Sequence, residues 1–566
     1  MKKLSKLIGV ALIALTMASC ERGGGTSPSE PIIDYTTSGP HAGEAYYKMD
    51  PSEQPVAFSK VRKSAGYKAD MMPVGSPKAL VIPVDFTDYS CSTKQSLLRW
   101  GGCDGIRSDM EKAFFGKPEE TTWESLASYY EKTSYGKLKM EGEVTDWYHY
   151  ENTAASLMQN TQSTAIRSAQ VLRAAVRNWK NNIYEEILEK NRVEHQDKSE
   201  DYLEAISLEE AQEKYKEFDV NEDGYLDAVY VIYAVEDYSV QGSPGYGYGD
   251  GNGDIFWAFT YWDGQQTANK DNPETCTYFW ASYDFMYKDR DAKGDYIRDE
   301  NGKILPDATT FIHETGHILG LEDYYTYDYN DDYPPLGGID MMDNNIGDHN
   351  AYSKSLLGWT NPYYVQDDCE ITLKPFATSG DCVILGRTFG RTRSLMEEYL
   401  ILEYYSPADD TLNYWHSTHA FEGTYPKTFQ DYGVKVMHVD SRLGGFRIST
   451  IAGESGNDYY TFKGFVDGVD PRYDKVDIAF TNTRSRNPEN MEDFRLLSLV
   501  ESKGKKGLVN GEYRSVTDES LFHTGDKFDD EYYKDFRFHN GSQVGYSFEI
   551  KEMNADGVTI SFKKTF

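Results

Sequence analysis

The sequence has few basic residues for its size. Its 566 residues include 58 Lys and Arg against 92 Asp and Glu, which gives a formal net charge of −34. Binding of DNA or RNA requires clustered Lys and Arg that neutralise phosphates, so the charge balance excludes nucleic acid as a partner. Apolar side chains are not scarce, because hydrophobic residues make up 39% and aromatic residues 14% of the chain. A disordered acidic chain carries far fewer aromatics, so we expect a folded protein with two or more domains.

Long apolar runs are also scarce. The run from Leu7 to Met17 falls well short of the roughly 20 residues that a membrane-spanning helix needs. Three lysines precede it and small residues follow it before Cys20, which is typical of a secretory signal over residues 1–19. The end of this segment resembles the lipobox of bacterial lipoproteins, in which the cysteine is lipid-modified after cleavage. The alternative is an ordinary secretory signal with a chance cysteine.

The signal implies that the mature protein leaves the cytoplasm. We expect it in the bacterial cell envelope, held at the outer membrane or cell surface by a lipid on Cys20, or released from there. Residues 20–77 are interpreted as a flexible tether, rich in Gly, Ser and Pro at its start, with a removable pro-segment as an open alternative. Apart from the N-terminal lipid we expect no membrane contact, and we expect a monomer.

Cysteine is rare, with six residues in the chain, one of which is the lipidation candidate Cys20. The others include two pairs that each bracket a short segment: Cys91 with Cys103, and Cys369 with Cys382. Local pairs of this kind are plausible disulfides in an oxidising compartment, which leaves Cys276 as an unpaired, buried residue. No Cys-x-x-Cys or Cys/His spacing indicates a cysteine-held metal.

The chain divides into two regions by its apolar patterns. The run from Ala79 to Phe86 predicts a buried strand, although Pro83 argues against a central position in a sheet. Apolar spacing predicts further elements: helices over Ser125–Tyr135, Ala155–Leu188 and Tyr352–Leu357, and strands over Leu226–Val235 and Asp254–Trp262. Residues 366–566 show short strands between turns, and Asn554–Gly557 predicts a hairpin before the last strand. We therefore expect an α+β fold, with a mixed domain over 78–365 and a β-rich, sandwich-like domain over 366–566.

The motif with the clearest chemistry is His313-Glu314-Thr315-Gly316-His317. Residues four apart share one face of a helix, so both imidazoles can reach one Zn²⁺ while Glu314 projects toward the water at the metal. The alternative is a surface helix with two histidines one turn apart.

The residues after this motif offer a third ligand. Gly320 allows the helix to end in a left-handed conformation, so that the chain can fold back toward the metal. Asp323, three residues further, would complete the three protein ligands that a catalytic zinc takes, with one position left for water. Glu322 is a weaker candidate for the same place, since adjacent residues seldom both reach one ion.

The run from His313 through Gly320 to Asp323 resembles the zinc motif of the immune inhibitor A-like metallopeptidases, relatives of the metzincins in which Asp replaces the third His. Downstream, Gly337-Gly338-Ile339-Asp340-Met341-Met342 is similar to that family's Met-turn. This likeness implies that Met342 forms an apolar floor beneath the zinc. It also implies a metzincin-like catalytic domain over roughly residues 78–365.

Motif and resemblance together imply an enzyme that hydrolyses peptide bonds of extracellular proteins, with one catalytic zinc and Glu314 as the general base. A further donor should stabilise the oxyanion, and His349 and Tyr352 are the nearest candidates, with a structural role as the alternative for each. Proteins or peptides are the expected partners. Two other functions stay open: a surface adhesin or glycan-binding lipoprotein with a degenerate peptidase fold, and a glycopeptidase acting on mucin-like proteins.

A second metal is predicted upstream, in an acidic loop before the Leu226 strand. Oxygen ligands stand at the alternating positions of a calcium loop: Asp219, Asn221, Asp223, Tyr225 through its carbonyl, and Asp227. Gly224 permits the sharp turn, whereas Tyr230 replaces the glutamate that would end an EF-hand loop. We expect at least one structural calcium here, and the alternative is an acidic turn between a helix and a strand.

Overall fold

The computed structural model describes residues 41–50, 57–67, 71–160, 162–248, 253–291, 293–327, 334–386, 394–419, 427–450, 458–485, 487–504 and 516–566. The predicted signal over 1–19, the lipidation candidate Cys20 and the start of the tether lie outside the described residues. Among the helices that are described, none is long and apolar enough to cross a membrane.

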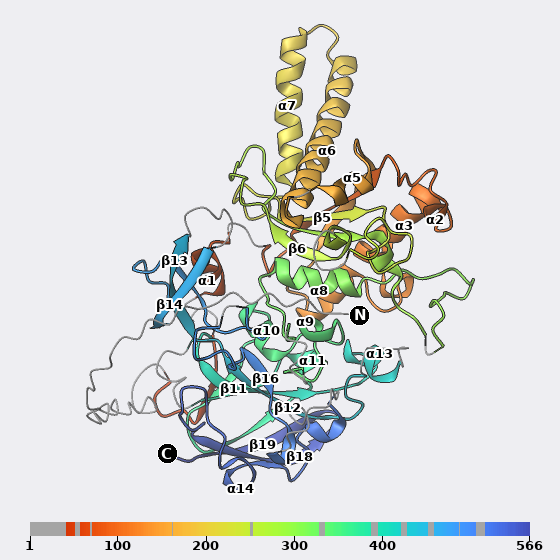
Figure 1. The fold of residues 1–566 in the computed structure, drawn as a ribbon. Helices are drawn as coiled ribbons and strands as arrows, with labels where there is room; N and C mark the ends of the chain where they lie inside the picture. Colours follow the sequence, from red (N-terminus) through yellow and green to blue (C-terminus); the bar gives the residue numbers. More distant parts are fainter. Residues whose placement is uncertain are drawn as a thin grey trace, which may run out of the picture.

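The N-terminal region is built on a mixed sheet with the order β3-β2-β5-β7-β6, in which β4 also pairs with β2 (Figure 1). Its strands are β2 (Lys78–Phe86), β3 (Glu141–Val144), β4 (Tyr148–Tyr150), β5 (Ala228–Tyr233), β6 (Phe259–Trp262) and β7 (Thr277–Ser282). All neighbours are parallel except β6, which runs antiparallel to β7 at one edge. The predicted strand over Asp254–Trp262 is shorter than expected, because a 3-10 turn occupies Gly253–Phe256.

Strand β2 is central in this sheet, which contradicts the expectation drawn from Pro83. On one side β2 pairs with β5 along most of its length. On the other side β3 pairs with residues 78–81 and β4 with residues 84–86, so Pro83 falls in the gap between the two partners. A residue without an N–H is tolerated at this point because no neighbouring strand needs its hydrogen bond.

Helices cover both faces of the sheet. One face bears α3 (Gly102–Phe115), α4 (Leu126–Thr133) and α8 (Thr309–Ile318), together with the short α2 (Gln95–Leu98). The other face bears α5 (Ala154–Gln159), α6 (Thr164–Glu194) and α7 (Glu200–Lys216). The sequence predicted a single helix over Ala155–Leu188, whereas the structure has two. Helices α6 and α7 form an antiparallel hairpin that projects from the rest of the molecule (Figure 1).

The C-terminal region is rich in strands, as predicted. A six-stranded sheet has the order β1-β8-β10-β11-β12-β16 and a four-stranded sheet the order β17-β18-β19-β9, and an apolar cluster fills the space between them. A third sheet has the order β14-β13-β15. The strands are β8 (Tyr363–Val365), β9 (Cys369–Leu373), β10 (Cys382–Leu385), β11 (Glu398–Tyr405), β12 (Gly433–Asp440), β13 (Leu443–Thr450), β14 (Asp458–Val466), β15 (Lys475–Ile478), β16 (Leu497–Leu499), β17 (Lys527–Phe528), β18 (Tyr546–Asn554) and β19 (Gly557–Lys564).

The predicted hairpin is present, since Asn554 pairs with Gly557 where β18 turns into β19. Two short helices, α9 (Met341–Asn344) and α10 (Ala351–Leu356), lie between α8 and β8. Further short helices join the C-terminal strands: α11 (Phe376–Ser379), α13 (Asn413–Thr418) and α14 (Asp530–Tyr533). Helix α10 confirms the helix predicted over Tyr352–Leu357 to within one residue at each end.

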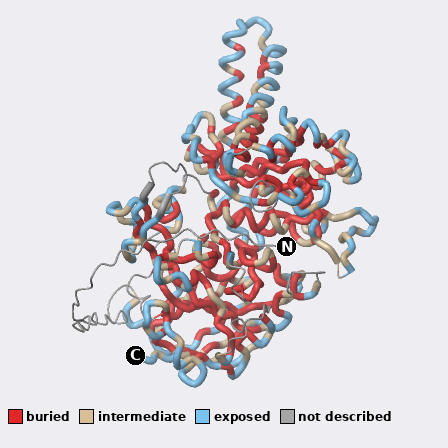
Figure 2. Tube along the Cα trace, in the orientation of Figure 1, coloured by how far each residue is buried: buried red, intermediate tan, exposed pale blue. Residues whose placement is uncertain are grey.

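One apolar core runs through both regions. Its members include Ala79 and Val81 of β2, Phe311 and Ile312 of α8, and also Ile401 of β11 and Met437 of β12. Buried residues accordingly form a continuous band from the mixed sheet into the C-terminal sheets (Figure 2). The segment before residue 78 takes part as well, because β1 (Tyr46–Lys48) pairs with β8 and α1 (Phe58–Ser64) packs on β15.

The cysteines behave differently in the two predicted pairs. Cys91 and Cys103 form a disulfide, as predicted. Cys369 and Cys382 are free, which corrects the second prediction. Cys369 lies in β9, whose partner is β19, whereas Cys382 lies in β10 and pairs with β11. The two residues therefore belong to opposite sheets of the sandwich, although they are close in sequence. Cys276 is free and buried, as expected.

Candidate active site

Helix α8 carries the His-Glu-x-x-His motif, and its start is fixed by Asp307. The Asp307 carboxylate accepts hydrogen bonds from the backbone N–H of Thr309 at 2.8 Å and from its hydroxyl at 2.5 Å. Capping of this kind satisfies donors that a helix leaves unpaired in its first turn. The next residues, Phe311 and Ile312, are fully buried and anchor one face of α8 in the core. The residues of the motif, His313, Glu314 and His317, can therefore use the rest of the helix surface.

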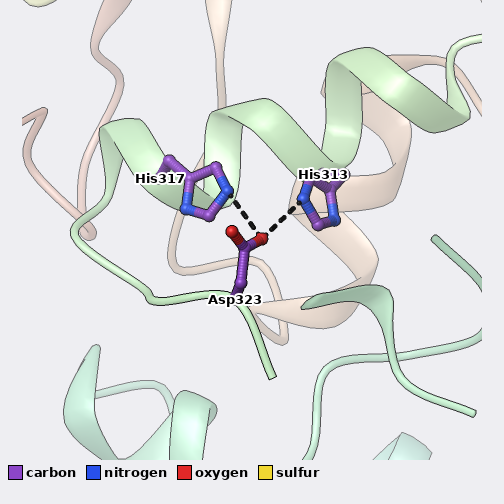
Figure 3. Close-up of side chains that lie close together, drawn as sticks. All are labelled: His313, His317 and Asp323. Carbon is purple, nitrogen blue, oxygen red and sulfur yellow. Dashed lines mark ion pairs between the residues drawn. The ribbon is translucent and has the colours of Figure 1, made fainter. Parts of the chain in front are cut away.

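The three predicted zinc ligands converge. Nε2 of His313 lies 3.2 Å and Nε2 of His317 lies 3.1 Å from Oδ1 of Asp323 (Figure 3). The chain returns to the helix because Gly320 adopts a φ of 98°, and the N–H of Leu321 bonds the carbonyl of Gly316 at 2.9 Å. This is the left-handed helix end that the sequence predicted. Glu322, the weaker alternative, is not among the converging residues.

Both imidazoles are held by backbone carbonyls. Nδ1 of His313 donates to the carbonyl of Met341 and Nδ1 of His317 to the carbonyl of Leu321, each at 2.8 Å. A neutral imidazole carries one proton, so these bonds leave the lone pair of each Nε2 directed at Asp323. Carbonyl acceptors behind the ligating histidines are common at metal sites, where they fix the tautomer and the ring orientation.

The donor set fits a zinc ion. The Asp323 oxygen that faces both rings is buried and has no hydrogen-bond partner within the described part of the chain. Two nitrogen lone pairs and a carboxylate oxygen at this separation repel one another unless a proton or a metal ion lies between them. Two His and one Asp are also the ligand types of a catalytic zinc with an open position.

The charges at the site shift the acidity of its members even without an ion. Burial alone would lower the pKa of His317, but the Asp323 carboxylate raises it to about 10. Burial would likewise raise the pKa of Asp323, yet the two histidines hold it far below its ordinary value. The carboxylate is thus ionised at any physiological pH, as a zinc ligand must be.

Glu314 lies between the two histidines on α8 and is only 8% exposed. Its backbone carbonyl accepts a hydrogen bond from the hydroxyl of Thr260 at 2.9 Å, which ties α8 to the edge strand β6. Helical spacing turns its carboxylate to the same side as His313 and His317. This is the placement that a general base needs beside the metal.

The Met-turn lies against the zinc helix. A side chain added at Gly316 would place its Cβ 2.4 Å from Sδ of Met342, so the methionine occupies the space that the glycine leaves open. Met342 is fully buried, and its carbonyl accepts the N–H of Tyr324 at 2.8 Å. The preceding residue, Met341, supplies the carbonyl that orients His313. Met342 and its turn thus support the site from the core side.

His349 lies on the Met342 side of α8, where its Cε1 would be 3.7 Å from a Cβ added at Gly316. The side chains of His349 and Tyr352 are both buried, with 1% and 0% exposure. The His349 ring packs among the rings of Tyr129, Tyr130 and Trp359, and burial holds its pKa well below the ordinary value. A side chain enclosed in this way contacts no substrate, so in this structure both residues pack the core below the Met-turn.

Two tyrosines that the sequence analysis did not single out lie at the ligands instead. The hydroxyl of Tyr327 donates to Oδ2 of Asp323 at 2.6 Å, beside the oxygen that faces the histidines. The Tyr325 ring lies 6.5 Å from the His313 ring, centroid to centroid. Burial, with the charges of Asp323 and Glu314 nearby, raises the pKa of Tyr325 far above its ordinary value, so its hydroxyl stays a donor. In the sequence, the pattern that could have identified these two residues is the tyrosine-rich run directly after Asp323.

The predicted calcium loop lies between α7 and β5. Asp219 accepts the N–H groups of Asp223 and Gly224 at 3.0 and 2.9 Å, and Gly224 has the left-handed φ of 87° that the tight turn requires. Oδ2 of Asp227 accepts the N–H of Val220 at 3.2 Å, whereas its Oδ1 is buried without a partner. Burial raises the pKa of Asp227 to about 7. The carboxylates of this loop do not converge as closely as the zinc set does, as far as the described residues go.

A second His/Glu cluster joins β11, β12 and the chain before β18. Nε2 of His438 lies 3.0 Å from Oε1 of Glu398, and Nδ1 of His539 lies 2.8 Å from Oδ2 of Asp440. Here the carboxylates are already satisfied, because Arg442 binds Asp440 through two nitrogens and backbone N–H groups bind Glu398. The carboxylate oxygens of Glu398 and Asp440 all have donors, whereas Oδ1 of Asp323 has none. This is the pattern of a buried ion-pair network.

Two histidines one helical turn apart, an aspartate returned by a glycine turn and a glutamate between them define the site of a zinc-dependent peptidase. Residues 69–349 match the family model of the immune inhibitor A peptidase M6 catalytic domain. The protein is therefore a zinc metalloendopeptidase that contains an M6 catalytic domain, with His313, His317 and Asp323 as its candidate zinc ligands. No curated protein matches the chain.

Proposed function

We propose that this endopeptidase acts outside the cytoplasm on extracellular proteins, while a lipid on Cys20 holds it at the cell envelope. The observation that carries the catalytic part is the convergence of His313, His317 and Asp323 beside Glu314. The location is supported by the N-terminal sequence alone. Labelling of the expressed protein with a radioactive fatty acid tests it, and a Cys20→Ser variant that keeps the label would contradict it.

The chain's own residues account for the proton transfers of peptide hydrolysis. Bound at the three ligands, zinc supplies Lewis acidity that lowers the pKa of water and polarises a carbonyl. Glu314 takes the proton of the attacking water and passes it to the departing amine. Its carboxylate is nearly buried, which keeps competing water away from that proton.

Tyr325 is the residue best placed to donate to the oxyanion. Its ring lies beside His313, and its raised pKa keeps the phenol protonated at neutral pH. A hydroxyl held next to the metal ligands can bond the carbonyl oxygen as its negative charge develops. Tyr327, which bonds Asp323, serves to orient that ligand.

The substrate is proposed to bind in extended form along β6. This strand pairs with β7 on one side and has no partner strand on the other in the described structure. The Thr260 hydroxyl fixes its distance from Glu314. Three of its four residues, Phe259, Tyr261 and Trp262, expose aromatic rings, which a long-lived free edge avoids unless it binds something.

The decisive experiment on catalysis compares Glu314→Gln with wild type. Activity on casein should fall by about 10²- to 10⁴-fold, since the general base is lost, while one bound zinc per chain and the thermal stability are kept. Glu322→Gln is the matched control, because Glu322 is adjacent to the ligand Asp323 but not part of the set. Full activity of the Glu314 variant would refute the assignment.

Binding along β6 is tested with a series of peptide substrates N-methylated at one backbone position at a time. Pairing with a strand uses the N–H of every second residue on the side that faces it. The kcat/KM should therefore fall at alternate positions. A fall at no position, or at all positions equally, would exclude strand pairing.

A further inference from the structure

The segment before the family domain packs against the zinc helix. Residues 57–67 precede the range 69–349 that matches the M6 catalytic domain. Val61 of α1 is fully buried, and the hydroxyl of Ser64 accepts the N–H of Val476 in β15 at 3.3 Å. The segment is thus held by the C-terminal region, where α1 packs on β15.

A chain of contacts links this segment to the active-site elements. Arg62 lies over Gly320, whose added Cβ would meet Nε of Arg62 at 2.8 Å. The Arg62 guanidinium lies 3.4 Å from the centroid of the Tyr67 ring. The Tyr67 ring in turn contacts Trp262 edge-on, with 5.5 Å between the ring centroids. Gly320 follows the zinc helix and Trp262 ends β6, so Arg62 and Tyr67 together connect the ends of these two elements.

Trp262 lies two residues after Thr260, the residue whose hydroxyl bonds the carbonyl of Glu314. Two residues of strand separate them, or about 7 Å. The indole stacks on Tyr261 at 4.6 Å and remains 42% exposed. An exposed indole backed by two tyrosines, at one end of the catalytic strand, offers a flat apolar surface to a ligand.

We propose that Tyr67 and Trp262 form an aromatic subsite that binds an apolar side chain of the substrate about two residues from the scissile bond. Arg62 is a positioning residue, which holds Tyr67 over the helix end through its guanidinium. The two rings come from different parts of the chain: Trp262 belongs to the matched catalytic domain, whereas Tyr67 precedes its first residue. The inference deepens the proposed function and rests on the proposed cleavage of proteins at this site, and the distance of two residues follows from an extended substrate.

The chemistry of the surface defines the preferred side chain. Rings that meet edge-on leave aromatic faces and edges free for a third ring or an aliphatic chain. The faces of these rings carry negative electrostatic potential, so an acidic residue of the substrate would lose water without gaining a partner. The subsite should therefore favour Phe, Tyr, Leu or Met over Asp or Glu.

The test is a cleavage profile on a peptide library, measured for wild type, Tyr67→Ala, Trp262→Ala and Arg62→Ala. Wild type should show a preference of about tenfold in kcat/KM for an aromatic over an alanine at one position about two residues from the cleaved bond. In Tyr67→Ala and Trp262→Ala the ratio of kcat/KM values should fall toward one, because KM for the aromatic peptide rises. Tyr67→Phe keeps the ring and should keep the preference. Arg62→Ala should shift it in the same direction. The fall in kcat/KM on a short peptide that ends before this position should be smaller in every variant than the fall on peptides that reach it.

Tyr46→Ala is the matched control, since Tyr46 is an exposed tyrosine of the same N-terminal segment that contacts Tyr363 in the C-terminal sheet. Its profile should equal that of wild type. An unchanged preference in both ring variants would overturn the proposal, and so would an equal loss on all peptides including the short one. If the ring variants change the selectivity but the N-methylated peptides show no fall at alternate positions, the subsite stands and binding along β6 is excluded. Failure of the subsite and failure of the proposed binding mode are therefore distinguishable.

Discussion

Gly316 and Gly320 stand four residues apart on the zinc helix and are needed for different physical reasons. Gly320 is required by its backbone, which adopts a left-handed φ at the helix end. Gly316 has ordinary helical geometry and is required by space, because Met342 fills the position of its absent side chain. Both glycines are visible in the sequence motif, but the motif does not show why each of them is needed.

Substitution of Gly316 by alanine should therefore destabilise the protein even though alanine favours a helix. The new methyl group forces the buried Met342 out of place, at a cost of about 1–3 kcal/mol in the free energy of unfolding. Denaturant unfolding measures this cost. The double variant Gly316→Ala/Met342→Ala should recover part of it, since the shorter side chain leaves room. Strictly additive losses would show that the two residues do not compete for space.

The two tyrosines at the ligands should have separable effects. Tyr325→Phe should lower kcat by about 10²-fold, because a donor to the oxyanion is lost, and leave zinc affinity unchanged. Tyr327→Phe removes the hydrogen bond to Asp323 and should weaken zinc binding by about 10- to 100-fold, with a smaller effect on kcat at saturating zinc. Competition with a chromogenic chelator and steady-state kinetics give the two quantities. The opposite assignment of effects would contradict the proposed roles.

At the scale of elements, the acidic loop joins the helical hairpin α6–α7 to the central strand β5. Three of its carboxylates, Asp219, Asp223 and Asp227, have pKa values that burial raises, and they repel one another further. Backbone N–H groups satisfy part of each carboxylate, but Oδ1 of Asp227 has no partner. We propose that a calcium ion binds this oxygen and that the loaded loop holds the base of the α6–α7 hairpin against β5.

The calcium proposal predicts a specific dependence of stability on pH. The pKa of Asp227 in the folded protein is about 7, above its unfolded value of 3.8. Its neutral form is therefore favoured by folding, and stability is lost as pH rises through 7. Without calcium, wild type and Asp227→Asn should melt alike at pH 4, and wild type should melt lower at pH 8. Calcium should raise the melting temperature of wild type at pH 8 and leave Asp227→Asn unchanged; an equal response of both would exclude this site.

Elements also show where local patterns were insufficient. The apolar run of β2 predicted a strand correctly, but its central place depended on a gap between β3 and β4 that no local pattern encodes. Cys369 and Cys382 are close in sequence, yet β9 and β10 enter different sheets. Proximity along the chain indicates proximity in space only when the chain between the two residues turns back on itself, and here it crosses the sandwich.

At the scale of the whole molecule, the catalytic and C-terminal regions share one core. Tyr399, Ile401 and Met437 of the C-terminal strands belong to the same apolar cluster as Met342 of the Met-turn. A buried ion pair between Lys435 and Glu403, 2.6 Å apart, lies at this junction. Glu403 also accepts the backbone N–H of Ala351 at 2.7 Å, which fixes the start of α10.

A chain truncated after residue 365 should accordingly fail to fold. Removal of β11 and β12 exposes the apolar surface below the Met-turn and leaves the start of α10 without its acceptor. Circular dichroism and zinc content of the purified fragment measure the outcome. A folded, zinc-binding fragment that ends at residue 365 would show that the catalytic region is independent. The full chain serves as the reference.

The sequence by itself determined the chemistry of the site, because His313, Glu314, His317 and Asp323 are brought together by helical spacing and one glycine turn. Such geometry depends on neighbours in the chain, and periodicity encodes it. Only the tertiary structure decided what surrounds the site: that His349 is enclosed in the core, that Tyr325 and Tyr327 face the ligands, and that Tyr67 reaches Trp262. These contacts depend on how strands from distant parts of the chain pair and on which side chains fill the space between them. That packing is settled by the folded chain as a whole, and no local pattern carries it.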